Sequence, residues 1–409
     1  MSMSTYKPQG FKKLFHDTRR FLAKKWLSIM PALQIGITGS HGKTNTTLLV
    51  AKVLEAFGPT VATDINLDTI FNVPITAFKV MPWTKYVVWE LGIDTPQEMD
   101  YHLEIAKPTI GIVTGISPVH TDYDHLGSME NLIKEKRKLI EILPAHGYAI
   151  LNGDDANVKS MSSQTKTKTI FYGISAGSNV QVDNHSLKVS LDGTSFKLND
   201  EGETYEIQTG LIGVHHIYTV MAGYCLLKAI KPENNFQHKF IKVVKKIKPL
   251  QGRMNLEKGP MNTLLLNDSL RANPDSTRAG LETLEQIPYT KGRKIAVIGE
   301  MGELDDPVSE HKKTGIEICK LKLDYVLCIG PLRRYTVKSA IENGFSKERI
   351  GYADDIFEAA DRLKKLLKPN NLWYLKGSLL RNYKRIVQLL NGEKVCCDRV
   401  LCPYEHCGY

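Results

Sequence analysis

Residues 33–55 read LQIGITGSHGKTNTTLLVAKVLE, and this stretch decides the class of fold. Its first six residues have the pattern of a short buried strand, and a helix pattern, TTLLVAKVLEAFG, runs from residue 46 to residue 58. A glycine-rich turn joins the two. A strand, a glycine-rich turn and a helix in this order predict a phosphate-binding loop, because backbone N–H groups and the amino end of the helix then face phosphate oxygens. The spacing is that of GxxxxGK[ST], except that Ile37 replaces the first glycine and Gly36 stands beside it.

The loop predicts a nucleotide but does not choose a reaction, because kinases, ATPases and ligases all use such loops. Lys43 is expected to reach the β- and γ-phosphates, and the Thr44 hydroxyl is expected to hold Mg²⁺. The expected nucleotide contacts are the consecutive residues Gly39, Ser40, His41, Gly42, Lys43, Thr44 and Asn45.

Further strands and helices alternate downstream of the loop. Apolar strand patterns occur at 86–91 (YVVWEL) and 109–114 (TIGIVT), and a helix pattern spans 131–143. This alternation predicts an α/β domain built on a mostly parallel sheet with helices on both faces. Residues 180–210 alternate polar and apolar side chains between turn signals and predict a small antiparallel excursion.

A domain boundary is expected near Lys248, because strand and helix patterns start afresh beyond it. Four strand patterns, at 262–266, 294–298, 325–329 and 372–375, predict a second, smaller Rossmann-like α/β domain. The expected organisation is a basic helical segment at 1–32, an ATP-binding domain at 33–248, a C-terminal domain at 249–392 and a cysteine-rich tail at 393–409.

Composition narrows the functional classes. The chain has 409 residues and a formal charge of +10, spread along the sequence rather than gathered in one basic run. A phosphate-rich small molecule explains this charge about as well as nucleic acid does, so the charge alone does not favour nucleic acid. The sequence has neither an apolar run long enough to span a membrane nor a secretory signal pattern, and we expect a cytoplasmic protein.

The segment 11–30, FKKLFHDTRRFLAKKWLSIM, mixes large apolar side chains with basic ones in a helical pattern. One interpretation is a helix packed on the following domain. The other is a helix that lies on a membrane surface.

Two residues after predicted strands are candidates for metal binding. Glu90 ends the strand at 86–91, where a carboxylate faces the ligand crevice and can share the Mg²⁺ held by Thr44. The alternative is a solvated glutamate. His120 follows the strand at 109–114 in the segment TGISPVHTDYDHLGS, and Lys136 lies on the next helix.

The order of these motifs resembles the Mur ligases, which activate a carboxylate as an acyl phosphate and join it to an amine. The resemblance rests on GITGSHGKT, WELG, TGISPVHTDYDHLGSMENLIKEKRKL, LNDSLRANPDS, GEMGELDDPVSEH and WYLKGS, and it covers residues from about 33 to 390. Within the family, the sequence most resembles the ligases that add D-Ala-D-Ala to a UDP-muramoyl tripeptide. A different, non-UDP-sugar carboxylate with another amine, or a non-catalytic ATP-binding role, remain alternatives.

The resemblance implies a site with ATP and two Mg²⁺ ions. Thr44 and Glu90 would hold the first ion, and His120 would hold the second. Lys136 matches the family's carbamylated lysine, whose carbamate is a carboxylate-like ligand, although Lys134 and Lys138 are alternative matches. Lys43, His120, Lys136 and Lys376 are the catalytic candidates that the resemblance implies.

The second domain would complete the nucleotide site. The resemblance implies that Asn273 binds adenine, Arg253 contacts phosphates or ribose, and Glu300 holds ribose hydroxyls. ANPDS around Asn273 is also a good helix N-cap, and both interpretations can hold together. Lys376 in the KGS motif would meet the amine or the acyl phosphate. The chain departs from the family after this motif, at 379–381.

Two features at the ends of the sequence have no settled function. Family members carry an N-terminal domain that grips the UDP-sugar, whereas this sequence reaches its loop at residue 36, so we expect the two remaining domains or a protein partner to take over that role. The tail holds Cys396, Cys397, Cys402, His406 and Cys407. It lacks a clean C-x₂-C pair, and both structural zinc and a free tail remain open.

Overall fold

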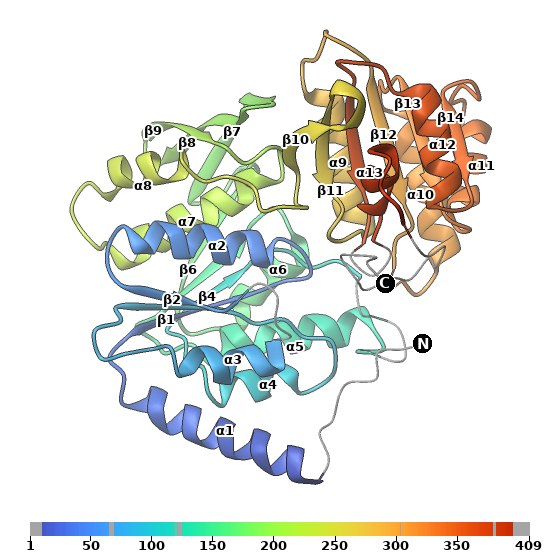
Figure 1. Cartoon of the computed structure of the whole chain (residues 1–409). Coiled ribbons are helices and arrows are strands. Elements are labelled where there is room, and N and C mark those ends of the chain that lie inside the picture. The colour runs from blue at the N-terminus through green and yellow to red at the C-terminus, as the bar shows by residue number, and fades with distance from the viewer. Residues whose placement is uncertain are drawn as a thin grey trace. The chain divides into compact units, whose positions relative to one another are not determined.

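A computed structural model describes residues 10–64, 69–118, 121, 125–302, 304–378 and 382–395. The chain forms two compact units, each with its own sheet (Figure 1). The first unit comprises Met1–Leu187, Ser195–Gln208 and His216–Ile247, and the second comprises Lys188–Thr194, Thr209–His215 and Lys248–Tyr409.

The first sheet has nine strands in the order β2-β3-β1-β4-β5-β6-β7-β8-β9. They are β1 (Leu33–Thr38), β2 (Thr60–Ala62), β3 (Tyr86–Glu90), β4 (Ile110–Val113), β5 (Tyr148–Asn152), β6 (Lys168–Gly173), β7 (Val180–Ser190), β8 (Gly193–Asp200) and β9 (Glu203–Thr209). All pairs from β2 to β7 are parallel. The turns from β7 to β8 and from β8 to β9 are too short for a parallel crossover, so these strands are antiparallel, as the sequence predicts.

Helices cover the first sheet on both faces (Figure 1). The helical elements of this unit are α1 (Gly10–Ser28), α2 (Lys43–Glu55), α3 (Thr69–Ala77), α4 (Glu98–Leu103), α5 (Met129–Glu141), α6 (Ala156–Ser160), the 3₁₀ turn η1 (Met161–Gln164), α7 (His216–Ile230) and α8 (Phe236–Val244). Because helices shield both faces, successive strand residues are buried whichever way they point, as in the five buried residues 34–38 of β1.

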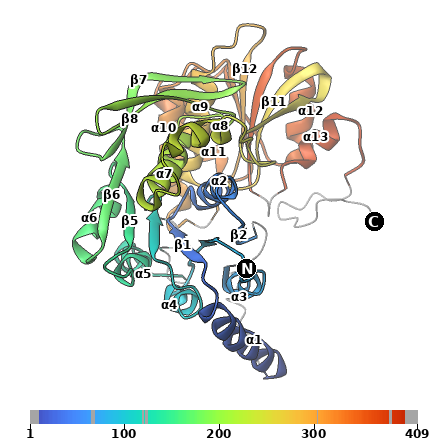
Figure 2. The same ribbon diagram turned by 90° about the vertical axis from the view of Figure 1, so that its left-hand side faces the viewer.

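Helix α1 lies outside this sandwich, against α3 and α4 rather than against the sheet (Figure 2). Its buried residues are Arg20, Ala23 and Leu27. Packing on the following domain is thus confirmed, and Trp26 and Leu27 take part in it, but most large apolar side chains of the predicted amphipathic pattern remain exposed. Phe11, for example, is exposed.

The second sheet has six strands in the order β10-β11-β15-β12-β13-β14. They are β10 (Asn255–Gly259), β11 (Thr263–Asp268), β12 (Lys294–Gly299), β13 (Tyr325–Ile329), β14 (Ile350–Ala353) and β15 (Leu372–Lys376). Only the β10–β11 pair is antiparallel. The carboxyl ends of the other five strands therefore share one edge of this sheet.

Helices also cover both faces of the second sheet. The helical elements of this unit are the 3₁₀ turn η2 (Pro260–Asn262), α9 (Pro274–Gln286), α10 (Pro307–Cys319), α11 (Arg333–Glu342), α12 (Ile356–Leu366) and α13 (Arg385–Leu390). Strand β12 shows why both faces are apolar: Ala296 and Ile298 pack with the α9–α11 side, whereas Ile295 and Val297 pack with the α12–α13 side.

The predicted fold class, a loop-bearing α/β domain plus a smaller Rossmann-like one, is confirmed. Strands β2, β5, β6, β10 and β14 were not predicted. Cys225 and Cys328 are buried thiols, and Cys319 is half-buried. The cysteine tail, except residues 393–395, lies outside the described residues. Among the described residues, no helix combines the length and the apolar character needed to cross a membrane.

Candidate active site

The glycine-rich loop follows β1 and packs against the segment after β4. Gly39 has φ 150°, and a Cβ atom there would lie 2.1 Å from Thr114 Oγ1. Thr114 Oγ1 in turn donates to the carbonyl oxygen of His41 at 2.5 Å. Ser40 N donates to Gly115 O at 2.7 Å. Position 39 therefore requires glycine, and Thr114 fixes the shape of the loop.

The loop ends at Gly42, the N-cap residue of α2. Its φ of 78° is left-handed, which glycine adopts without strain, and its hydrogen cannot supply a side-chain cap. A helix leaves its first N–H groups without intrahelical partners, so the amino end of α2 suits an anion, which also benefits from the helix dipole. Asn45 lies in this first turn of α2.

Two lysine amines converge on one carbonyl oxygen of the loop. Lys43 Nζ lies 2.6 Å from Gly39 O, and Lys136 Nζ lies 3.0 Å from the same oxygen. Lys43 comes from the first turn of α2 and Lys136 from the middle of α5. The structure thus brings the predicted loop lysine and the predicted carbamylated lysine to the same carbonyl oxygen.

Lys136 is fully enclosed by protein. Its side chain is 2% exposed. Burial lowers the pKa of the Lys136 amine well below 10.5, and the nearby charge of Lys43 lowers the pKa further. Both effects favour the neutral amine, which is the form that can attack CO₂. In contrast, Lys134 is exposed, and Lys138 is paired with Asp100 and Glu135. Burial therefore favours Lys136 among the three candidate lysines.

Thr44 and Glu90 form the second contact of the predicted site. Thr44 Oγ1 donates to Glu90 Oε1 at 2.9 Å. Strand β1 lies between β3 and β4, so the carboxyl end of β3 brings Glu90 next to the loop. A hydroxyl and a carboxylate are both hard oxygen ligands, which suits Mg²⁺.

His120 cannot be placed, because it lies outside the described residues. Within the described part of the chain, no group of three or more His, Cys, Asp or Glu side chains has a metal-binding arrangement. The Thr44–Glu90 pair contains only one residue of these four types, so it does not count as such a group.

In the second unit, Lys376 ends β15 and forms a buried ion pair. Lys376 Nζ lies 2.7 Å from Asp268 Oδ2, and the two side chains are 2% and 15% exposed. Tyr374 donates a hydroxyl hydrogen bond to the same oxygen at 3.0 Å. Asp268 and Lys376 are register partners on adjacent parallel strands, so both reach the carboxyl edge of the sheet.

Other cations surround this pair. Burial lowers the pKa of the Lys376 amine below 10.5, the charge of Asp268 opposes this, and the charges of Arg253 and Arg333 reinforce it. The structure therefore places Arg253 within electrostatic reach of Lys376. Arg333 is fully buried and donates from Nε to Gly299 O at 2.8 Å. This edge is a positively charged region suited to an anionic group.

Asn273 is the N-cap of α9. Its Oδ1 accepts from Ser276 N at 2.8 Å, and Ser276 Oγ accepts from Asn273 N at 3.2 Å, which completes a capping box. Among the described residues, the Nδ2 group of Asn273 donates to no other side chain or backbone group. The helix-cap interpretation is confirmed, and the amide hydrogens are left for a ligand.

Glu300 follows β12 and has a clear structural partner. Its Oε1 accepts from Leu332 N, at the start of α11, at 2.6 Å. The residue is 4% exposed. Its predicted ribose contact is untested, and the helix contact explains much of its burial.

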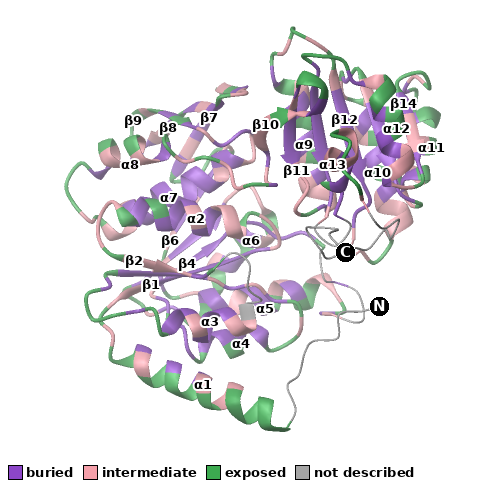
Figure 3. Ribbon diagram, viewed as in Figure 1, coloured by how far each residue is buried: buried purple, intermediate pink, exposed green. Residues whose placement is uncertain are grey.

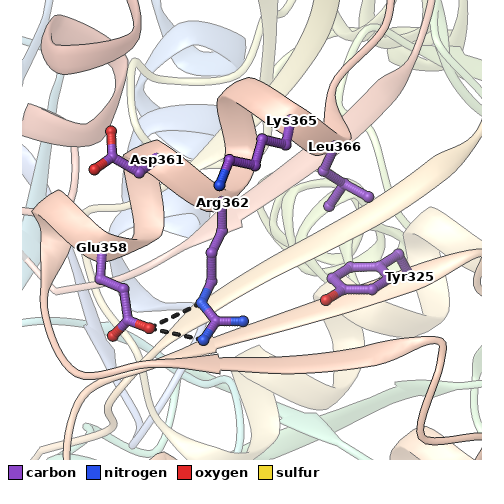
Figure 4. A pocket seen from close by; sticks show the side chains of 6 residues that line it. All are labelled: Tyr325, Glu358, Asp361, Arg362, Lys365 and Leu366. Atoms are coloured by element: carbon purple, nitrogen blue, oxygen red, sulfur yellow. Dashed lines mark hydrogen bonds and ion pairs between the residues drawn. The ribbon is translucent and has the colours of Figure 1, made fainter.

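Figure 4 shows a surface hollow on the second unit, between β13 and α12. Arg362 crosses it and donates to Glu358 Oε1 from Nε and Nη2 at 2.9 and 2.7 Å. Tyr325, which lines the hollow, is the first residue of β13, whereas the candidate residues lie at the carboxyl ends of the strands. The hollow is thus remote from that edge, and the ion pair that crosses it joins two residues of one helix.

Sequence reasoning missed Asp268 and Thr114 as supporting residues. Asp268 could have been found, because it follows the strand predicted at 262–266, where a carboxylate marks a ligand edge. Thr114 could not have been found from the sequence, because it meets the loop only where the fold pairs strands β1 and β4.

Comparison with known families agrees with this geometry. The model for the Mur ligase middle domain matches residues 37–227. The model for the Mur ligase glutamate ligase domain matches residues 252–379. Together the two matches span most of the chain.

Individual relatives agree with the family models. The UDP-N-acetylmuramoyl-tripeptide–D-alanyl-D-alanine ligase of Bacillus subtilis is 28% identical over 371 residues, which are 90% of this chain and 78% of that protein. MurF from Acinetobacter baumannii has a similar fold, with a TM-score of 0.81 at 22% identity over 92% of this chain and 81% of that one. MurF ligase from Thermotoga maritima in complex with ADP has a TM-score of 0.80 at 19% identity, covering 95% and 87%.

Proposed function

The chain belongs to the Mur ligase family, and we propose that it is an ATP-dependent ligase joining D-Ala-D-Ala to the carboxylate of a UDP-muramoyl tripeptide. The name of the Bacillus subtilis relative, and of other relatives such as that of Escherichia coli, supports this substrate pair. Both ATP and a UDP-linked substrate are cytoplasmic molecules, so the proposed reaction takes place in the cytoplasm.

The observation that carries the proposal is the pair of amines on Gly39 O. A nucleotide loop alone needs only Lys43. A second, buried lysine held neutral beside it suits a carbamate: the Lys136 nitrogen bonds to the carbon of CO₂ and loses one proton. The product has a carboxylate-like charge, which is a good ligand for hard cations.

In the first half of the proposed reaction, an oxygen of the substrate carboxylate attacks the γ-phosphorus of ATP. ADP leaves, and an acyl phosphate forms. Lys43 neutralises the charge on the transferring phosphoryl group, and the N–H groups at the start of α2 bind the remaining phosphate oxygens. Thr44, Glu90 and the Lys136 carbamate fit Mg²⁺ as oxygen ligands, and Mg²⁺ when bound supplies further charge neutralisation on the phosphates.

In the second half, the amine nitrogen attacks the acyl carbon, phosphate leaves, and the nitrogen loses a proton. We propose that Lys376, oriented by Asp268, binds the acyl phosphate or the substrate carboxylate as a point charge. The depressed pKa of Lys376 makes its charge sensitive to an arriving anion, because an anion favours the protonated amine.

The second unit also supplies the proposed adenine contact. Since Asn273 Oδ1 is used by the helix cap, the side chain can only donate, from Nδ2, to a ring nitrogen of adenine. Arg253 is proposed to contact the phosphates or ribose, and Glu300 the ribose hydroxyls. His120 is proposed as a ligand of the second Mg²⁺.

The test is phosphate release by the purified chain with Mg-ATP, a UDP-muramoyl tripeptide and D-Ala-D-Ala. Release is expected to require both the acid and the amine. Lys43→Ala is expected to lower kcat by roughly 100-fold or more, because charge on the transferring phosphoryl group is then uncompensated. Lys52→Ala is the matched control, since Lys52 is an exposed lysine on the same helix, paired with Glu55.

The substrate pair is tested separately. Replacing D-Ala-D-Ala by glutamate, and the UDP-sugar by other acids, distinguishes the proposed ligase from a related amide ligase. Phosphate release that ignores both acid and amine would contradict a ligase. Nucleotide binding without any turnover would support a non-catalytic ATP-binding role instead.

A further inference from the structure

Helix α1 is fixed on the first unit by one face. Ala23 and Leu27 join the core cluster that contains Val73 and Ala77 of α3. The guanidinium of Arg20 lies 3.4 Å from the ring centre of Tyr101 on α4. Trp26 Nε1 donates to Val80 O at 2.8 Å. These contacts set the rotation of the helix about its own axis, and therefore which side chains face away from the protein.

The opposite face of α1 carries large apolar side chains that are exposed to solvent, and Figure 3 shows most of this helix in the colour of exposed residues. We call these residues, together with Ile29 just beyond the end of the helix, the apolar stripe; those on α1 are Phe11, Leu14, Phe15, Phe21 and Leu22. Their exposure ranges from 51% for Leu22 to 84% for Phe11. The spacing of Phe11, Phe15 and Leu22 is four and seven residues, which keeps them on one side of the helix.

The exposed apolar side chains are unevenly distributed over the protein surface. Among the described residues, fourteen large hydrophobic side chains are exposed, and six of them belong to the apolar stripe. Single exposed apolar residues need no explanation, but a continuous group marks an interaction surface.

Lysines border the apolar stripe. Lys12, Lys13, Lys24 and Lys25 are all exposed on α1, and the helix carries a single acidic residue, Asp17. Asp17 is paired with Lys13 at 2.7 Å. Lysine side chains beside an apolar face can reach anionic headgroups while the apolar groups enter the headgroup boundary.

We propose that the apolar stripe and its lysines dock the first unit on an anionic lipid surface. A second copy of this chain fits the face less well. Two copies meeting around a twofold axis would place the same lysines near one another, and like charges oppose such a contact. A bilayer with negative headgroups satisfies both the apolar side chains and the lysines.

The test is co-sedimentation of the whole chain with vesicles. Wild type is expected to pellet with vesicles containing equal parts of phosphatidylglycerol and phosphatidylcholine, and to remain soluble with phosphatidylcholine alone. Binding to the anionic vesicles should weaken as salt is raised, because salt screens the lysines. A triple variant, Leu14→Ser with Phe15→Ser and Leu22→Ser, should bind the anionic vesicles at least about tenfold more weakly.

Two further variants sharpen the result. Lys12→Gln with Lys24→Gln and Lys25→Gln should also lose about tenfold or more. Ile316→Ser with Ile341→Ser removes exposed apolar side chains of the second unit and should leave binding unchanged. Circular dichroism and phosphate release check that each variant is folded, independently of lipid binding.

Three outcomes overturn the proposal. They are absence of wild-type binding to anionic vesicles, equal binding by the triple serine variant, and a wild-type dimer in sedimentation velocity that this variant converts to a monomer. The last result would assign the apolar stripe to self-association.

Discussion

At the scale of single residues, the position of Lys136 decides the chemistry. A lysine that is almost wholly buried and shares its acceptor with Lys43 is poorly suited to carry a charge. The neutral amine that results is reactive toward CO₂ near neutral pH, whereas an exposed lysine is almost entirely protonated there. Local burial thus selects one lysine from the run KEKRK.

This leads to a direct spectroscopic prediction. In ¹³C-labelled bicarbonate, the protein is expected to show a carbamate carbonyl resonance in its NMR spectrum. Lys136→Met should abolish the resonance and lower kcat by roughly 100-fold, since a charged ligand near the phosphates is lost. Lys134→Met, which changes an exposed lysine two residues away, should alter neither. A resonance that persists in Lys136→Met would assign the carbamate to another lysine.

At the scale of secondary-structure elements, helix α9 combines two tasks at its first turn. Asn273 Oδ1 caps the helix, and the Nδ2 group of the same side chain is proposed to donate to adenine. A cap and a ligand contact therefore share one side chain. This arrangement allows the two tasks to be separated by mutation.

Asn273→Ala is expected to destabilise the second unit by about 1 kcal/mol and to raise KM for ATP by roughly tenfold, because both the cap and the adenine contact are lost. Asn273→Asp keeps a capping oxygen but has no amide donor, so it should raise KM and retain stability. Thermal unfolding and ATP-dependent kinetics measure the two effects. An Asn273→Asp enzyme with an unchanged KM would remove Asn273 from the adenine site.

Elements also show where sequence reasoning succeeds and where it stops. Strands β1 and β3 were predictable because both are short apolar runs. The outward face of α1 was not predictable, because periodicity reveals an apolar side but not which side meets protein. Arg20 has no apolar signal, yet it is buried through its contact with Tyr101.

The same distinction applies to the site. The order of the motifs along the chain predicted the glycine-rich loop, Glu90 and the capping residue Asn273. Pairings between distant residues, such as Lys136 with Gly39 and Lys376 with Asp268, depend on how strands and helices meet in three dimensions. The motifs indicated the residues involved, but only the fold gives their hydrogen-bond partners.

At the scale of the whole molecule, acid stability should depend on a buried histidine of the first unit. His102 is fully buried, with Nε2 2.8 Å from Gly92 O, and burial lowers its pKa to about 4. Below pH 6.5 the unfolded chain binds a proton at His102 that the folded chain does not bind until about pH 4. The stability of the first unit therefore falls as pH decreases through this window.

Between pH 6.5 and pH 5 the expected loss from His102 is about 2 kcal/mol. Urea unfolding followed by circular dichroism at the two pH values measures it. His102→Gln removes the titrating group, so the variant should lose less stability over the same interval. If wild type and variant lose equal stability, another group is responsible for the acid sensitivity.

The placement of α1 outside the α3–α4 layer has a consequence for substrate delivery. Two layers of packing, each about 10 Å thick, separate the axis of α1 from the sheet whose edge carries the loop. A bilayer that touches α1 would therefore lie roughly 20 Å or more from the phosphates. If α1 docks on a bilayer in this way, we expect the acceptor to reach Lys43 from the aqueous side rather than from the bilayer.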